Sequence, residues 1–213
     1  MITTEGLNYR YEKLQVNKAP TPLFSFPDEM NKKRLAAVLA TDGVLFASSI
    51  YGLNEIWYKN YDRSKFHLFN DSREWMQMDK LGHLKAAHII TAYGYYSFRW
   101  AGMEKTKAAL YGGALSLGYL TAIEVLDGYS SNWGFSLADM SANVLGSAIF
   151  VTQAIFLEER RVKLKISYHP TRYAQYRPEV LGDNAASRII KDYNGQTQWL
   201  SVSAVLMMPK SNK

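Results

Sequence analysis

The chain has 213 residues, a formal net charge of +6 and no cysteine. Its length suits one substantial domain with a trailing arm, and its 47% hydrophobic residues exclude a disordered chain. The mean hydropathy of -0.23 argues against a protein dominated by membrane spans, and the missing cysteine excludes disulfides, thiol chemistry, cysteine-ligated zinc and lipidation on the chain as given.

The first half of the chain predicts an arm and two long helices. Residues 1–30 are polar and carry three prolines, which indicates an extended N-terminal arm. A helix is predicted from 31 to about 58, and the mixture of charged and aromatic residues over 59–74 predicts a surface loop. A second helix is expected over 75–100.

Two further helices follow a short basic link at 102–107. The helix predicted over 108–127 carries the pairs Gly112/Ser116 and Ala114/Gly118, small-residue spacings that let helix backbones approach closely. The next helix is expected from 136 to about 157, with Ser136 as its cap in a Ser-x-x-Asp capping box.

These elements predict an all-α fold, a compact bundle of four main helices with small-residue packing. We expect an extended arm at 1–30, the four-helix domain at 31–166, and a C-terminal arm at 167–213 with one short helix near 185–193. The chain ends without a terminal cap, which suggests an incomplete version of a longer protein.

The basic charge favours a lipid surface or a protein partner, because the sequence lacks a nucleic-acid-binding motif. The apolar cores of the four helices, about 14 to 19 residues long, are at or below the roughly 20 needed to cross a bilayer. Basic residues flank the helices as in a four-span protein, but the first loop is basic too. We expect a peripheral or partly embedded protein; a spanning and a soluble bundle remain alternatives.

Polar residues recur inside three of the otherwise apolar helices. Because buried ionisable groups are costly without partners, and because spacings of three and four share one helical face, we expect them to meet in one buried site, the polar cluster. Its predicted members are Asp79, Lys80, His83, Glu124, Asp127, Asp139 and Asn143.

The polar cluster allows three interpretations. The favoured one is a structural hydrogen-bond network that fixes the assembly of the helices. A divalent metal site is the second, and a centre for acid–base catalysis is the third. The candidate metal ligands are Asp79, His83, Glu124, Asp127 and Asp139. No cofactor is otherwise expected, and no nucleophile is obvious.

Two other ionisable residues lie in the predicted helices. His88 is five positions from His83, about 140° round the helix, so it is expected in the core or on the surface, away from the cluster. Asp42 in the first helix either joins the cluster or faces solvent.

The ordered motifs DKxGH (79–83), ExxDG (124–128) and WGFSxxDxxxNxxG (133–146) resemble the YfiM-type family of predicted periplasmic lipoproteins, which is uncharacterised. The resemblance covers roughly residues 31–165, and the same order is distantly similar to VanZ-type membrane proteins. It implies export to the periplasm and association with the outer membrane. The chain departs from the family in lacking a signal peptide and a lipidation cysteine.

Longer Bacteroidetes-like members of that family include the plug subunit of the type IX secretion translocon, which closes the periplasmic mouth of an outer-membrane barrel. The resemblance therefore implies a non-enzymatic protein that docks on an outer-membrane protein partner and plugs a secretion channel. The alternative is a membrane-proximal, metal-dependent hydrolase acting on a lipid or cell-wall precursor. The family has no established chemistry to carry over to these residues.

Overall fold

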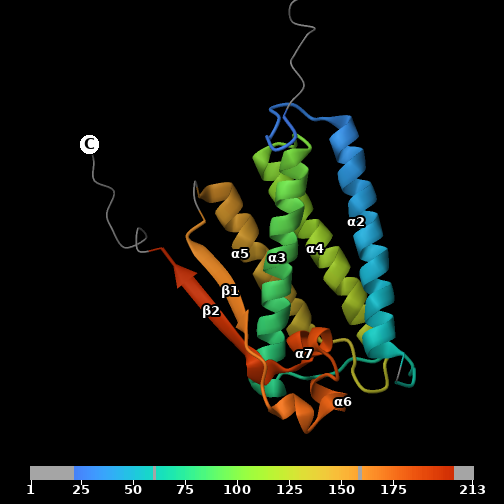
Figure 1. The fold of residues 1–213 in the computed structure, drawn as a ribbon. Coiled ribbons are helices and arrows are strands. Elements are labelled where there is room, and N and C mark those ends of the chain that lie inside the picture. Colours follow the sequence, from blue (N-terminus) through green and yellow to red (C-terminus); the bar gives the residue numbers. More distant parts are fainter. Residues whose placement is uncertain (1–21, 60, 158–159, 204–213) are drawn as a thin grey trace, which may run out of the picture.

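The computed structural model describes residues 22–59, 61–157 and 160–203. Four long helices dominate it: α2 (Lys32–Leu53), α3 (Met78–Trp100), α4 (Lys105–Gly128) and α5 (Leu137–Phe156). Helices α3, α4 and α5 pack against one another, and α2 lies along one side of them (Figure 1). The predicted bundle of four main helices is confirmed.

Helix α2 begins at a side-chain cap and is tied to the chain before it. The Asn31 side-chain oxygen, Oδ1, accepts hydrogen bonds from the backbone amides of Lys33 and Arg34. The buried Arg34 guanidinium donates to the carbonyls of Pro22, Ser25 and Trp100. The predicted arm is described only from residue 22, and that part is held against the start of α2. A π-helical turn at Asn54–Tyr58 continues the helix.

The two middle helices begin at different residues from those expected. Helix α3 follows Met76 and Gln77, whose φ angles of 50° and 66° are left-handed, so the continuous helix starts after them. The sequence predicted a basic link over residues 102–107, and the predicted end of this link is wrong. The Glu104 side chain accepts from the Thr106 amide, so the helix already begins at Lys105.

Small residues set the distance between the packed helices. A Cβ on Gly112 would lie 2.7 Å from the Thr91 carbonyl oxygen, and one on Gly146 would lie 2.0 Å from the Leu84 carbonyl oxygen. Both α4 and α5 therefore approach the backbone of α3 closely. The pair Ala114/Gly118 instead faces outward, and a Cβ on Gly118 would meet nothing within 4 Å.

The all-α class is wrong in one respect, because the chain also forms a small sheet. Strands β1 (Val162–Tyr168) and β2 (Gln196–Val202) pair antiparallel, with Leu164 opposite Leu200. Strand β1 alternates apolar and polar residues, the pattern of a strand, whereas β2 begins with three polar residues and lacks this signal. The predicted domain division remains a prediction, although residue 166 falls within β1.

Two short helices lie between the two strands in the sequence. These are α6 (Pro178–Leu181) and α7 (Ala185–Lys191), and the second agrees with the predicted short helix. They cover the end of the bundle where α3 begins (Figure 1).

The outer surface of the four helices is almost free of charge. Of their described side chains, the exposed charged ones are Lys32, Lys33, Lys105 and Lys107, at the starts of α2 and α4. These starts lie at the same end of the bundle (Figure 1). The exposed positions along α5 are all uncharged: Leu137, Ser141, Val144, Leu145, Ala148, Thr152 and Phe156.

Two of the described helices, α2 and α4, are long and apolar enough to cross a bilayer by length and composition. The most apolar window of α2 is only 11% buried, against 33% for α4. A core helix or a signal sequence passes the same criterion.

Candidate functional site

The predicted members of the polar cluster lie at the end of the bundle opposite the exposed lysines (Figure 1). This end contains the start of α3, the end of α4 and the start of α5. Asp79, Lys80 and His83 come from α3, Glu124 and Asp127 from α4, and Asp139 and Asn143 from α5.

Lys80 lies between three carboxylates. Its ammonium is 3.2 Å from Asp79 Oδ2 and 3.0 Å from Asp139 Oδ1, and it forms a shorter ion pair with Asp71. The Lys80 side chain is only 11% exposed. Burial alone would lower its pKa, but the hydrogen bonds to Asp71 and Asp139 outweigh burial and raise it. The ammonium thus stays charged and joins α3 to α5.

Asp71 is a member of the cluster that the sequence did not predict. It lies in the segment before α3, and its Oδ1 accepts a hydrogen bond of 2.7 Å from the Ser136 hydroxyl. Although burial opposes ionisation, hydrogen bonds to Lys80, Asp139 and Ser136 lower the pKa of this carboxyl. No periodic pattern marks Asp71 in the mixed sequence of 59–74.

His83 joins the three helices. Its Nδ1 is 3.2 Å from Asn143 Oδ1 and 3.5 Å from Glu124 Oε1, and its Nε2 is 4.0 Å from Asp79 Oδ1. Since the two neighbours of Nδ1 are acceptors, this nitrogen is placed to donate. The Glu124 oxygen forms no hydrogen bond within the described part of the chain.

Ser136 caps α5, but the cap is completed by a different helix. The Ser136 hydroxyl accepts from the Asp139 amide at 3.1 Å, as a capping box requires. In a complete capping box the Ser136 amide would donate to the Asp139 side chain. Here it donates to Glu124 Oε2 at 3.2 Å. Glu124 is 1% exposed, and burial, followed by the charge of Asp139, raises its pKa to about 8.

We expect Glu124→Gln to flatten the pH dependence of stability between about pH 5 and 8. A carboxyl with a folded-state pKa near 8 and an ordinary value of 4.5 contributes stability below 4.5, which is lost as the pH rises through 8. Glutamine keeps an acceptor for the Ser136 amide and cannot ionise. Urea unfolding across this range measures the effect.

The matched control is Glu179→Gln, which removes an exposed carboxylate. The free energy of unfolding of the wild type should decrease as the pH rises, and that of the control variant should decrease equally. For the Glu124 variant the decrease should be smaller. Parallel curves for the Glu124 variant and the wild type would contradict the raised pKa of Glu124.

Two tyrosines outside the predicted set bond to the cluster. The Tyr58 hydroxyl donates to Asp127 Oδ1 at 2.8 Å, and the Tyr193 hydroxyl donates to Asp79 Oδ1 at 3.0 Å. Burial raises the pKa of Asp127 to about 6, and burial with the neighbouring acids raises the pKa of both phenols. Sequence periodicity cannot reveal these tyrosines, since they lie far along the chain from their partners.

A cavity of about 610 Å³ opens beside the cluster. Asp79, His83, Asp127 and Asp139 line it, together with aromatic and aliphatic side chains from the segments before α3 and after β1. A volume of this size is in the range of small-molecule sites.

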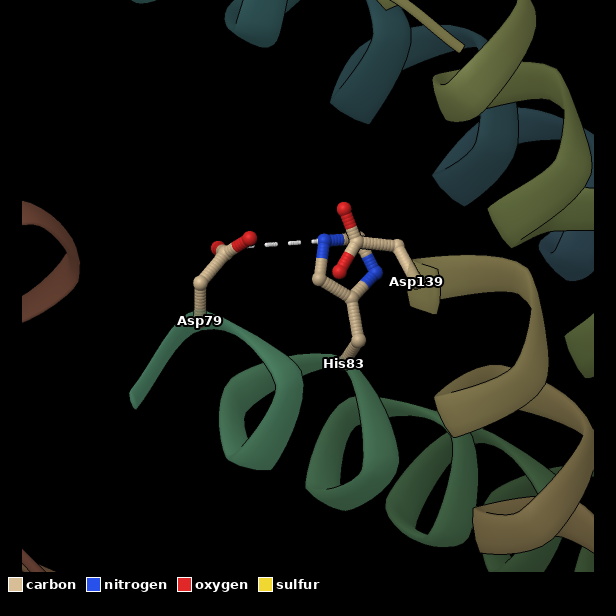
Figure 2. Close-up of side chains that lie close together, drawn as sticks. All are labelled: Asp79, His83 and Asp139. Carbon is tan, nitrogen blue, oxygen red and sulfur yellow. Dashed lines mark ion pairs between the residues drawn. The ribbon is translucent and has the colours of Figure 1, made fainter. Parts of the chain in front are cut away.

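Three of the predicted metal ligands come close enough to share an ion. Asp79, His83 and Asp139 each offer one ligand atom, and these atoms lie within 4.8 Å of one another (Figure 2). Lys80 and Tyr193 already bond to the Asp79 carboxylate, and Lys80 also contacts Asp139. Glu124 and Asp127 lie outside this group of three. Metal binding therefore stays a prediction.

The other ionisable residues lie apart from the cluster. His88 is 6% exposed and packs edge-on against Phe150, with ring centroids 5.5 Å apart, so it is in the core. Burial lowers its pKa. Asp42 accepts a hydrogen bond of 2.9 Å from the Tyr93 hydroxyl on α3 and does not join the cluster.

Comparisons with known proteins give one match. No curated protein and no solved structure matches the chain. Residues 67–155, which include every predicted member of the cluster, match a family model described as a predicted periplasmic lipoprotein, DUF2279. The family description places the protein in the periplasm, anchored to a membrane. Residues 67–155 are thus similar to the DUF2279 family of predicted periplasmic lipoproteins, whose function is uncharacterised.

Proposed function

We propose that the protein is a non-enzymatic docking protein that binds an outer-membrane protein through the outer face of α2. This face is defined by Leu39, Val44 and Tyr51, which are 56% to 69% exposed. A periplasmic, membrane-anchored location brings the protein to such partners.

The observation that carries the proposal is the exposure of a helix that has almost no charge beyond its first turn. After the buried Arg34, the only charged residue of α2 is Asp42, which accepts the hydrogen bond from Tyr93. Large exposed apolar side chains in water lose the free energy that burial would give, about 25 cal/mol per Å². An apolar surface of this kind marks a site of association with protein or membrane.

Exposed glycines favour a protein over lipid as the occupant. A Cβ on Gly43 of α2, like one on Gly118 of α4, would meet nothing within 4 Å, so the fold itself does not require glycine at these positions. Glycine costs a helix about 1 kcal/mol relative to alanine. A close approach by the backbone or side chain of a partner would offset that cost, whereas fluid lipid chains adapt to any surface.

The specific partner in this proposal is the channel of a secretion system. The motifs of the polar cluster resemble the YfiM-type family, whose longer members include the protein that plugs the type IX translocon. In that role, the polar cluster is structural: Lys80 and Ser136 fix the end of the bundle, and the apolar outer face makes the contact.

Site-specific photo-cross-linking in intact envelopes tests the docking surface. We expect a cross-linker at Val44 to capture an outer-membrane channel, because this side chain is 67% exposed on the proposed face. The control position is Glu179, also exposed but beyond the four-helix bundle. Gly43→Leu should abolish the Val44 cross-link, and Gly43→Ala should weaken it less.

Two outcomes of this experiment would contradict the proposal. One is capture of lipid alone from Val44. The other is capture of the same proteins from Val44 and Glu179. For the plug itself, loss of the protein should increase the passage of large solutes through the channel, and restoring it should reverse the leak.

A metal-dependent hydrolase is the second candidate, favoured by the ligand atoms of Asp79, His83 and Asp139 beside a cavity of about 610 Å³. It requires a divalent ion to replace the Lys80 ammonium or the Tyr193 hydroxyl on these carboxylates. Docking needs no such rearrangement, which is why it is preferred. Elemental analysis of the purified protein distinguishes the two candidates.

A further inference from the structure

One wall of the cavity beside the polar cluster consists of aromatic rings set nearly at right angles. The Tyr61 and Trp133 ring centroids are 4.6 Å apart with an angle of 77° between the planes. The Tyr58 and Trp133 centroids are 6.2 Å apart at 90°. All three residues line the cavity. We call these three rings the aromatic box.

A carboxylate lies directly beside the aromatic box. Asp127 lines the same cavity and is fixed by the hydrogen bond from the Tyr58 hydroxyl to its Oδ1. Ring faces attract cations through their negative quadrupole, and a neighbouring carboxylate adds a full negative charge. An organic ammonium ion in contact with these ring faces would be attracted by both the rings and the acid.

The charges around the cavity also favour a cation. Its described lining includes six carboxylates against two lysines, although the whole chain carries a net charge of +6. The carboxylates are Asp71, Glu74, Asp79, Asp127, Asp139 and Glu179. Lys80 compensates part of this charge, but a single ammonium faces three of these acids.

A buried polar atom in the cluster is also left without a hydrogen bond. Glu124 is 1% exposed, and its Oε1 forms no hydrogen bond in the described part of the chain, although His83 Nδ1 lies 3.5 Å away. His83 itself lines the cavity.

Apolar side chains line the rest of the cavity. Leu53, Ile123, Val180 and Ile190 belong to this lining. A ligand that fills the cavity therefore combines one positive group with an aliphatic stem. Small inorganic cations would leave the apolar lining without contacts.

We propose that the cavity binds an alkylammonium group on an aliphatic stem, with the ammonium in the aromatic box beside Asp127. The bound group is either a free aliphatic amine or the lysine side chain of a polypeptide, which share this chemistry. The carboxylates that hold Lys80 show how the same cluster binds an ammonium from the chain itself.

Isothermal titration calorimetry of the intact protein tests the proposal with matched probes. N-acetyl-lysine amide and n-butylammonium carry the charge, and N-acetyl-norleucine amide and n-butanol are their neutral counterparts. Each charged probe should bind at least about tenfold more tightly than its neutral counterpart, the ratio expected for a cation–π contact with a carboxylate nearby. Tighter binding of the lysine amide than of butylammonium identifies a polypeptide source, and the reverse identifies a free amine.

Two variants test the residues. Tyr61→Leu should lower the affinity for the charged probes about tenfold, while Tyr61→Phe, which keeps the ring, should leave the affinity unchanged. Asp127→Asn should weaken them similarly, because it removes the charge while keeping an acceptor for Tyr58. Circular dichroism checks that each variant is folded.

The proposal is overturned if neutral and charged probes bind alike, or if Tyr61→Leu and Tyr61→Phe behave identically. It is also overturned if only divalent metals bind. Variants at Gly43 should leave these titrations unchanged, so failure of the docking proposal and failure of this one give different results.

Discussion

Replacing Lys80 with methionine should lower the free energy of unfolding by about 3–5 kcal/mol, the cost of removing one partner from a buried ion pair. The Lys80 ammonium is the group that Asp71, Asp79 and Asp139 share, and its side chain is 11% exposed. Without it, three carboxylates repel one another at the junction of α3 and α5. Urea denaturation of the purified protein at neutral pH measures the loss. The loss should shrink in acid, where the carboxyls become protonated.

Lys85 provides a matched control on the same helix. It is buried, with 6% of its surface exposed, and burial lowers its pKa. No acidic side chain forms an ion pair with it among the described residues. Lys85→Met should thus be neutral or stabilising, because it replaces a poorly compensated buried amine with an apolar side chain. Equal destabilisation by the two substitutions would show that the ion pairs of Lys80 do not stabilise the fold.

Gly146→Ala should destabilise the protein by about 3 kcal/mol, at the upper end of the range for overpacked sites. The added Cβ would lie 2.0 Å from the Leu84 carbonyl oxygen and 3.0 Å from the Ala87 Cβ. Backbone cannot move aside as a flexible side chain can, so α5 must shift away from α3. Thermal unfolding of the variant measures the effect.

Gly118→Ala is the comparison for this substitution. It changes the same residue type inside a long helix, where a Cβ would meet nothing within 4 Å. The higher helix propensity of alanine then decides the effect, and the free energy of unfolding should increase by about 0.5–1 kcal/mol. A loss of stability in Gly118→Ala, or none in Gly146→Ala, would contradict the packing described above.

Helical spacing was enough to predict which polar residues share a face within each long helix. Asp79 and His83 share a face because they are four positions apart, and Glu124 could be assigned to the same site because an unpaired buried acid is costly. The role of Ser136 as a cap followed from a local pattern of four residues. Each of these inferences depends on a short stretch of chain and on one physical rule: helical periodicity, the cost of a buried charge, or the capping of a helix.

The residues that the sequence did not reveal reach the site from elsewhere in the chain. Asp71 lies in an irregular segment, and Tyr193 bonds to a residue 114 positions away. The pairing of β1 with β2 likewise joins segments separated by two short helices. No local pattern specifies such contacts, because they depend on where the whole chain places its segments.

The family match covers residues 67–155, and this boundary divides the cavity into two parts. Five of the six carboxylates that line the cavity lie inside the matched segment, as do His83 and Trp133. The sixth carboxylate, Glu179, lies outside it, and so do Tyr58, Tyr61 and Tyr193. Proteins that share only the matched segment can therefore keep the same internal ion pairs and yet differ in the molecules they admit. Selectivity for a ligand can change from one protein to the next while the framework of helices stays the same.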